Sequence, residues 1–495
     1  MSVILLVLLP VAAALLVCMP FGRRWIASVT VVSCLADLSL AARLASQVVA
    51  HHIPGKLLEP GWSNWLAVDG LSALIVLFIA FVASTAAIYS VGYMAHEDLT
   101  LKRLRLYHVN YNLFIFSMLA IPVLAEPTLV WIVIELTTLC SALLVSFYNT
   151  REALEAAWKY VVLSLMGAGL ALFGFLVLFA ASHAAAGQTY TWAALVTVAP
   201  RMPPVLMQTA FLLILIGLGT KVGLVPMHTW LPDAHSQAPS PVCALLSGIE
   251  TTSILYVILR LFPIMHGVRG AHAETWALVL GLISVGTAAF LLLQVKDYKR
   301  LFAFSTVEHM GIMLAAIGLG GSAAAYAAMQ QIVSHSVTKS FCFFAAGAAL
   351  LATGTREIGA VRGLIRRSPL AGAALIFGGL AIAGAPPMAV FLSEFLILKA
   401  GLEQRHYVAV ALLAAFIVIA FFGVMAHLNR MVFGPPPNGA PDPHHAASNT
   451  GSAFRLPFSC RLALIVAAVP VLLFGVYIPK PLHDLLTMAA AALHP

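Results

Sequence analysis

The sequence predicts an all-α polytopic membrane protein with about 14 transmembrane helices, and three observations carry this prediction. Hydrophobic residues make up 61% of the 495 residues and charged residues only 9%, whereas soluble domains carry about 25% charge. The mean hydropathy is +0.97. The apolar runs are long and continuous rather than alternating, which argues against a transmembrane β-barrel. This composition excludes a water-soluble globular protein, and no short repeat indicates a collagen or a coiled coil.

The apolar runs are long enough to be counted as membrane spans, each needing about 20 residues. The first run precedes Arg23 and Arg24 and has no basic segment before it, so we expect a first span rather than a cleaved signal peptide. Gly, Pro and short polar stretches separate the runs, as at Glu126-Pro127. The expected spans are 2–20, 26–49, 68–93, 107–125, 128–148, 159–181, 205–227, 239–262, 275–295, 301–319, 322–351, 369–397, 407–431 and 459–479.

The 27 basic residues are distributed unequally between the two sides of these spans. Because Lys and Arg accumulate in cytoplasmic loops, we expect both termini on the non-cytoplasmic side of a bacterial-type cytoplasmic (inner) membrane. The net charge of +8 is then a topology signal rather than a nucleic-acid patch. The expected cytoplasmic side holds Arg23, Arg24, Lys102, Arg103, Arg105, Arg151, Lys159, Lys296, Lys299, Arg300, Arg356, Arg362, Arg366, Arg367, Arg430, Arg455 and Arg461. The other side holds Lys56, Arg201, Arg260, Arg269, Lys399, Arg405 and Lys480, and the spans themselves hold Arg43, Lys221 and Lys339.

The spans divide into four regions. Residues 1–106 form three N-terminal helices, 107–262 a first repeat, 275–431 a second repeat, and 432–495 a cytoplasmic loop with the last helix. The loop, Gly434 to Pro457, is rich in Pro, Asn, Ser and His, which indicates a solvated segment; His444 and His445 fit this reading better than a metal site. The six cysteines stand singly without a C-x-x-C pair, so neither a disulfide framework nor a thiolate metal site is expected.

Ionisable side chains inside the spans are the main candidates for function. Each costs at least about 2.5–3.5 kcal/mol in the bilayer and therefore marks a pathway or a buried pair. Glu135 stands alone in an apolar run, where it is either a proton-exchanging group or a protonated packing residue. Lys221 lies among Gly217, Gly223 and Pro226, which indicates an interrupted helix; the alternative is a lysine that reaches the membrane edge.

The second half of the chain carries comparable residues. His335 and Lys339 are four residues apart and share one helix face. A continuous helix from Pro369 would place Glu394 about 37 Å along its axis, beyond the hydrocarbon layer, so we expect a break at the two preceding prolines. Glu250, Glu308 and His309 are possible further members of the pathway.

Two Gly/Pro-interrupted segments, 217–241 and 378–394, occur once in each half, and we expect broken helices near 217–227 and 384–394. Such a pair is typical of transporters built from inverted repeats with the pathway at the membrane midplane. The charges of Glu135, Lys221, Lys339 and Glu394 alternate in sign along the sequence. No aromatic cage or wide polar face for an organic solute is present, so protons or a small ion are the expected cargo.

At this point the motifs resemble a known family. Residues 220–235, followed by 238–242 and 244–248, are similar to the signature of the antiporter-like subunits of respiratory complex I, Mrp antiporters and membrane-bound hydrogenases. The segments 69–72 and 297–306 support the resemblance, which covers nearly the whole chain and implies 14 spans with both termini outside. The stretches 307–311, 339–341 and 387–395 most resemble the hydrogenase-4 component F branch.

The resemblance implies roles for these residues. Glu135 and Lys221 would form the ion pair of the first half-channel, Lys339 with His335 would connect the halves, and Glu394 would end the second half-channel. Relatives in complex I carry a Lys or His where an ungapped match places Thr252, with Glu250 nearby. The first half-channel would therefore lack its usual basic link.

Together these observations favour a proton-translocating antiporter-like subunit of a hydrogenase-type or complex I-like energy-converting redox complex. No motif for an iron–sulfur cluster, flavin, haem or nickel is present, so we expect no catalytic residues, cofactor or metal in this chain. The expected partners are other membrane subunits, a peripheral redox module and the lipid bilayer, with no nucleic acid. The alternatives are an Mrp-like cation/proton antiporter subunit, a non-conducting structural subunit, and an ion-coupled subunit of an inorganic-carbon uptake complex.

Overall fold

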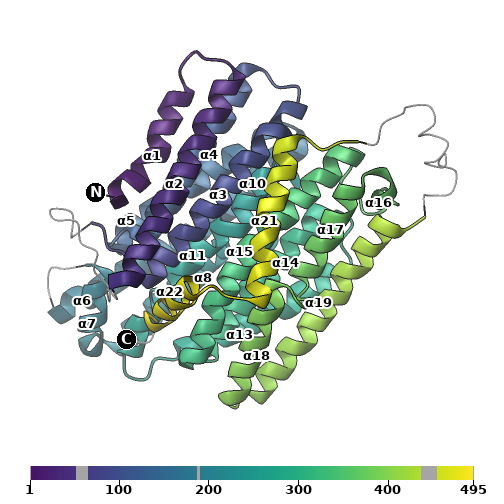
Figure 1. Cartoon of the computed structure of the whole chain (residues 1–495). Helices are drawn as coiled ribbons and strands as arrows, with labels where there is room; N and C mark the ends of the chain where they lie inside the picture. The colour runs from purple at the N-terminus through teal and green to yellow at the C-terminus, as the bar shows by residue number, and fades with distance from the viewer. Residues whose placement is uncertain (1, 52–64, 187–189, 436–453, 494–495) are drawn as a thin grey trace, which may run out of the picture.

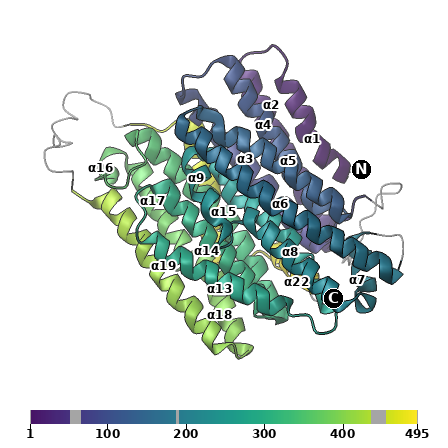
Figure 2. The same cartoon turned by 180° about the vertical axis from the view of Figure 1, so that it is seen from behind.

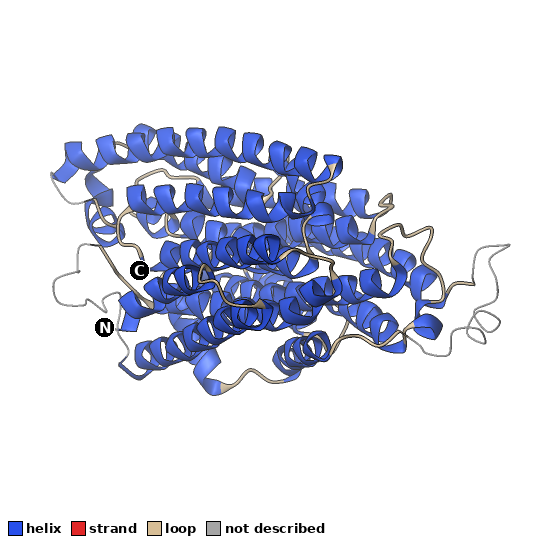
Figure 3. Cartoon of the chain, turned by 90° about the horizontal axis from the view of Figure 1, so that it is seen from above, coloured by secondary structure: helices blue, strands red, loops and turns tan. Residues whose placement is uncertain are grey.

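The computed structural model describes residues 2–51, 65–186, 190–435 and 454–493. Within these ranges the chain is almost entirely helical, with no strand and two isolated β-bridges, Leu66–Leu124 and Asp297–Glu357 (Figure 3). Most of the expected loop 434–457 lies outside the described residues. The helices are α1 (Ser2–Val17), α2 (Arg23–His51), α3 (Gly70–His96), α4 (Leu101–Ala120), α5 (Pro127–Val145), α6 (Arg151–Ala186), α7 (Trp192–Val198), α8 (Pro204–Val222), α9 (Trp230–Gln237), α10 (Ser240–Leu245), α11 (Thr251–Leu259), α12 (Phe262–His266), α13 (Ala273–Leu292), α14 (Tyr298–Gly318), α15 (Gly321–Thr353), α16 (Leu364–Arg367), α17 (Pro369–Ile382), α18 (Ala389–Glu403), α19 (Tyr407–Phe433), α21 (Phe458–Val476) and α22 (Lys480–Ala491).

The predicted fold class is confirmed. In the described part of the chain, 12 helices are long and apolar enough to cross a membrane, and two shorter apolar helices cover Val3–Val17 and Pro369–Ile382. Each of the expected spans falls on one or more of these helices. Their outward faces carry exposed large apolar side chains, such as Phe173, Phe422 and Ile465, as expected for helices that contact lipid.

Local sequence sets where the helices begin. Asp69 and Asp297 precede α3 and α14, and their carboxylates accept backbone N–H groups of the first turn. Thr100 does the same for α4 through its hydroxyl. These caps satisfy N–H groups that have no partner inside the helix. Proline occupies the first turn of α5, α8 and α17, where its missing N–H costs nothing.

The helices form one bundle with α15 at its centre. Figures 1 and 2 show α1, α2 and α4 along one edge and α18 and α19 along the opposite edge. Helix α15 packs against α3, α10, α14, α17, α18 and α21, and nearly all its residues from Ala324 to Ala349 are buried. The start of α1 and helix α22 lie at the same end of the bundle (Figure 1).

Regular helix geometry is interrupted at three places. Helix α8 ends at Val222, with Gly223 at a φ of +88°, and α17 ends at Ile382, with Gly384 at +75°. Glycine is favoured at both positions because a side chain is strained in this left-handed region. Between α10 and α11 the helix passes through a π-helical turn, residues Leu246–Glu250. The expected breaks are therefore confirmed: the first spans 223–226 and the second 383–388.

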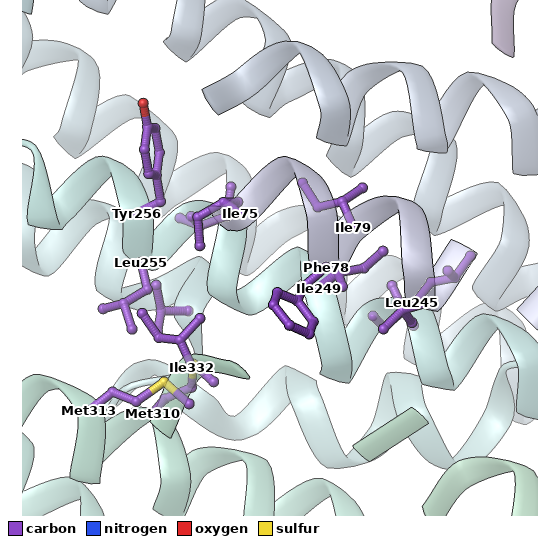
Figure 4. Packing of buried hydrophobic residues seen from close by; sticks show 14 of the residues in the cluster. Ile75, Phe78, Ile79, Leu245, Ile249, Leu255, Tyr256, Met310, Met313 and Ile332 are labelled. Atoms are coloured by element: carbon purple, nitrogen blue, oxygen red, sulfur yellow. The ribbon is translucent and has the colours of Figure 1, made fainter. Parts of the chain in front are cut away.

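Apolar side chains surround these interruptions. Figure 4 shows Phe78 of α3 beside Ile249 of the π-helical turn, with Met310 of α14 and Ile332 of α15 nearby. All four are buried or nearly so. Ile249, Met310 and Ile332 are direct sequence neighbours of Glu250, His309 and Gln331. Buried apolar side chains therefore adjoin Glu250, His309 and Gln331, which are described below.

Candidate functional site

A buried ion pair lies where α8 ends. Lys221 Nζ is 3.4 Å from Glu250 Oε1, and the two side chains are 3% and 1% exposed. Glu250 also accepts a hydrogen bond from the Tyr160 hydroxyl at 2.9 Å, with Ser141 Oγ at 3.5 Å. The carboxylate thus has a cation and hydroxyl donors around it, which is what a buried charge requires.

Lys221 reaches this position because it lies in the last turn of α8. Its ammonium donates to the backbone oxygen of Ile134 at 3.0 Å and to the Thr138 hydroxyl, both on α5. The C-terminal end of a helix carries partial negative charge and favours a cation nearby. The glycine turn that ends α8 therefore places a lysine at a favourable helix end in the protein interior.

The partner of Lys221 differs from the one that the resemblance implied. Glu135 acts electrostatically on Lys221, but in the described residues the ion pair of Lys221 within 4.0 Å is with Glu250. Glu135 Oε1 is buried without a hydrogen-bond partner. Glu250 is the last residue of the π-helical turn, and its carboxylate reaches Lys221 of α8 and Ser141 of α5. Thr252, two residues further on, is buried with its hydroxyl bonded to the backbone oxygens of Gly248 and Ile249.

Lys339 occupies a similar environment in the second half. Its ammonium donates to the backbone oxygen of Phe302 at 2.6 Å and to the Ser305 hydroxyl, both on α14. The side chain is fully buried. Glu308, also on α14, acts electrostatically on both Lys339 and Glu394. Lys339 and Glu394, the two charged residues that the sequence singled out in this half, therefore share Glu308 as a charged neighbour.

His335 and His309 connect the two halves. His335 Nε2 lies 3.1 Å from the backbone oxygen of Ser247, in the π-helical turn that ends at Glu250. The rings of His335 and His309 are 5.4 Å apart, centre to centre. His309 Nε2 lies 2.9 Å from the backbone oxygen of Ile382, the last residue of α17. Because a carbonyl oxygen only accepts, both Nε2 atoms carry hydrogen in this arrangement.

Glu394 is the last in this spatial series of buried polar side chains. Its Oε1 lies 3.9 Å from His309 Nδ1. Gln331 Nε2 lies closer to the same nitrogen, at 2.8 Å, and Gln331 Oε1 accepts from the Ser393 hydroxyl. The Glu394 carboxylate covers the turn that breaks α17, since a Cβ atom on Gly384 would lie 2.3 Å from Glu394 Oε2.

These residues form one row of polar groups between the two helix breaks, all of them buried except Glu135, which is partly exposed. Of the expected pathway residues, the structure links Lys221 with Glu250 and Glu394 with His309, while Lys339 is bonded to α14 and Glu135 stands beside the first pair. We call this set the central row; its members are Glu135, Lys221, Glu250, Ser247, His335, His309, Gln331, Glu308, Lys339 and Glu394.

Sequence reasoning missed several members and neighbours of this row. Tyr160, Ser247 and Gln331 carry no charge, so nothing in the sequence alone marks them as part of a polar row. Lys299 was counted as a loop charge, yet it is 1% exposed. Its ammonium donates to the backbone oxygens of Ser236 and Ala238, at 3.1 and 2.5 Å, at the end of α9. The signal for Lys299 was its place two residues after the capping Asp297, in the first turn of α14, where the side chain can turn into the bundle.

Arg260 was also counted as a loop charge. It is bonded to both carboxylate oxygens of Asp69, the cap of α3, and to the hydroxyls of Ser72 and Tyr256. The pair joins α3 to the end of α11 and is 12% and 14% exposed. In the described part of the chain no group of three or more His, Cys, Asp or Glu side chains is close enough to hold a metal ion.

Comparison with known proteins agrees with this architecture. The profile of the family described as "NADH:quinone oxidoreductase/Mrp antiporter, TM" matches residues 125–420, and that of "NADH-Ubiquinone oxidoreductase (complex I), chain 5 N-terminus" matches 64–103. The hydrogenase-4 component F homolog of Methylacidiphilum infernorum is 37% identical over 425 residues, 84% of this chain and 86% of the relative. NADH-quinone oxidoreductase subunit N of Desulforudis audaxviator is 26% identical over 493 residues, 96% of this chain and 95% of that one.

Among solved structures, a chain of the membrane-bound sulfane sulfur reductase, an archaeal respiratory membrane complex, superposes with a TM-score of 0.87. It is 25% identical and the match covers 99% of this chain and 97% of the other. A polytopic helical bundle with two broken helices, matched by these relatives over nearly its whole length, defines an antiporter-like class of membrane subunit. The chain belongs to the family of antiporter-like subunits shared by complex I, Mrp antiporters and membrane-bound hydrogenases.

Proposed function

We propose that this chain moves protons through the central row and that a redox reaction elsewhere in a membrane complex drives the movement. The observation that carries the proposal is the linkage between the two helix breaks. The Lys221–Glu250 pair adjoins the Ser247–His335 contact, and His335 adjoins His309 and Glu394. Intramembrane ionisable groups in such a series mark a proton relay.

In the first half of the chain, the Lys221–Glu250 ion pair can form and separate. While Lys221 and Glu250 are in contact, each stabilises the charged form of the other. When the pair separates, the buried ammonium loses its counter-charge, and releasing its proton removes the cost of an unpaired buried charge. Glu135, which is near Lys221 but not bonded to it, provides a second acid toward which the ammonium can swing.

In the second half of the chain, the Gln331 side-chain amide controls whether His309 can accept a proton. In this arrangement His309 is neutral, because Nε2 donates to Ile382 and Nδ1 accepts from Gln331. A proton arriving at Nδ1 requires that the Gln331 amide turn, so that its oxygen rather than its nitrogen faces the ring. Protonated His309 then lies next to Glu394, which completes the transfer toward the second break.

The membrane context follows from the family and the charge distribution. We propose that both termini lie on the non-cytoplasmic side and that a peripheral redox module attaches to the complex from the cytoplasm. The regions 107–262 and 275–431 would form the two half-channels. The similarity to a hydrogenase-4 component F homolog favours a hydrogenase-type module.

Membrane vesicles that contain the whole complex test the proposal. The measurement is acidification of the vesicle interior, followed with a pH-sensitive dye after NADH or dihydrogen is added. We expect Lys221→Ala and Glu394→Ala to abolish acidification. The matched control is Lys399→Ala on α18, whose side chain is 60% exposed. Acidification at the wild-type rate in both buried variants would refute the proposal.

A second candidate is cation/proton exchange, which the family profile also includes through Mrp antiporters. In that case an imposed sodium gradient would change the internal pH without any electron donor. A response to sodium alone that disappears in Lys221→Ala would replace the redox-driven pump with an antiporter.

A further inference from the structure

A buried carboxyl lies in the N-terminal helices, away from the central row. Asp37 is the fifteenth residue of the 29-residue helix α2, and its side chain is fully buried. Neither of its carboxylate oxygens has a hydrogen-bond partner. At about 1.5 Å per residue it lies roughly 21 Å along α2, near the middle of the membrane. An unpaired carboxylate there would carry a large desolvation cost.

No cation faces Asp37 from the helices packed around it. Helix α2 packs against α1, α3, α4 and α22. The described part of α1 contains no titratable residue, and Arg43, the nearest cation along α2 itself, is exposed. The nearest titratable group on α2 is the buried thiol of Cys34, which carries no positive charge. The cations of α4 lie in its first turns: Lys102 is exposed, Arg103 donates to the backbone oxygen of Phe147, and Arg105 donates to that of Met19. The other titratable groups of these three helices have partners of their own: Tyr89 with Phe344, Tyr93 with Tyr148, His96 with Phe454, Tyr111 with Ala83, Tyr107 with Ser90, His108 with Thr30, Lys480 with Asp484, and His483 with Tyr326.

Polar groups lead from Asp37 toward the start of α2. Thr30, Ser33 and Asp37 are spaced by three and four residues and share one face of the helix. The Thr30 hydroxyl accepts a hydrogen bond from Asn112 Nδ2 at 2.9 Å and lies 3.0 Å from His108 Nδ1. Ser33 Oγ and Asn112 Oδ1 are buried without partners. Each step along this face is about 4.5–6 Å, a distance that one bridging water covers.

We propose that Asp37 is a second proton-binding site, which exchanges its proton along Ser33, Thr30 and Asn112 to His108. A protonated carboxyl is neutral, so it can be buried without a counter-charge. Protonation therefore fits an acid that no cation faces. The unpartnered oxygens of Ser33 and Asn112 supply acceptors along the way. This site lies on α2 and α4, outside the two helix breaks, and it stands whether or not the central row pumps protons.

Infrared difference spectra of the purified complex test the assignment. A protonated carboxyl has a C=O stretching band separate from the bands of carboxylates and amides. We expect one such band in the wild type to be lost in Asp37→Asn and to shift in Asp37→Glu, which keeps the carboxyl if the first variant does not assemble. Glu403→Gln, an exposed acid on α18, should leave the band in place. Identical carboxyl bands in wild type and both Asp37 variants would overturn the proposal.

Two further measurements address the ion and the route. Replacing potassium by sodium at constant pH should leave the band unchanged, and its loss would show that Asp37 binds a metal cation instead. Thr30→Val removes the hydroxyl that links Asn112 and His108 to this face. After a pH jump the band should change more slowly in Thr30→Val than in the wild type, and an unchanged rate would overturn the proposed route.

Discussion

A double-mutant cycle on Lys221 and Glu250 tests the buried pair most directly. At 3.4 Å and an effective dielectric constant of about 20, two unit charges attract by about 5 kcal/mol. Much of this attraction offsets the cost of removing both charges from water. Removing one partner leaves the other charge buried and alone, which costs about 3–5 kcal/mol. We therefore expect Glu250→Gln and Lys221→Met each to lower the stability of the complex strongly.

The double variant Glu250→Gln with Lys221→Met should lose much less stability than the two single losses added together, because it leaves no unpaired charge. The assay is thermal unfolding of the detergent-solubilised complex, with proton translocation measured on the same preparations. Translocation should be absent from all three variants. Additive stability losses would refute the ion pair, and a double variant that translocates protons would show that the pair is structural only.

Three further predictions concern Gln331, Gly384 and the Asp69–Arg260 pair. Gln331→Leu removes the amide beside His309, and we expect translocation to fall while electron transfer by the complex continues, as donor-oxidation assays would show. Gly384→Ala adds a Cβ where Glu394 Oε2 lies 2.3 Å away and φ is positive, so translocation should be lost; Gly359→Ala, with nothing within 4 Å, is the neutral control. Asp69→Asn removes the carboxylate that holds Arg260, so the melting temperature should fall, by the equivalent of about 3 kcal/mol; an unchanged melting temperature would contradict the role given to this pair.

The fold was predictable because few types of secondary structure can cross a lipid bilayer. Long apolar runs must be helices, and the breaks followed from Gly and Pro placed where a charged residue would otherwise lie beyond the membrane. The pairing of charges was not predictable in the same way. The family resemblance implied Glu135 as the partner of Lys221, whereas the contact within 4.0 Å is made by Glu250, the last residue of the π-helical turn Leu246–Glu250.

Uncharged residues in the row and beside it were missed for a related reason. Gln331 and Ser393 contribute through hydrogen bonds whose direction depends on three-dimensional position, which composition does not reveal. Lys299 was assigned to a loop from its distance to the apolar run, yet it turns inward to the end of α9. By contrast, Asp37 carried the same signal as Glu135, a single acid inside a span, and the structure shows it to be buried.

The π-helical turn also offers a way for α10 and α11 to rotate relative to each other about the helix axis. A π turn holds one more residue than the α-helical turn that could replace it. If that extra residue moved into the neighbouring helix, side chains on one side of the turn would rotate by about 100° relative to those on the other. Ser247 and Glu250 would then turn relative to each other, so the Ser247–His335 and Glu250–Lys221 contacts could not both persist. One local change of winding at residues 246–250 would therefore couple these two contacts.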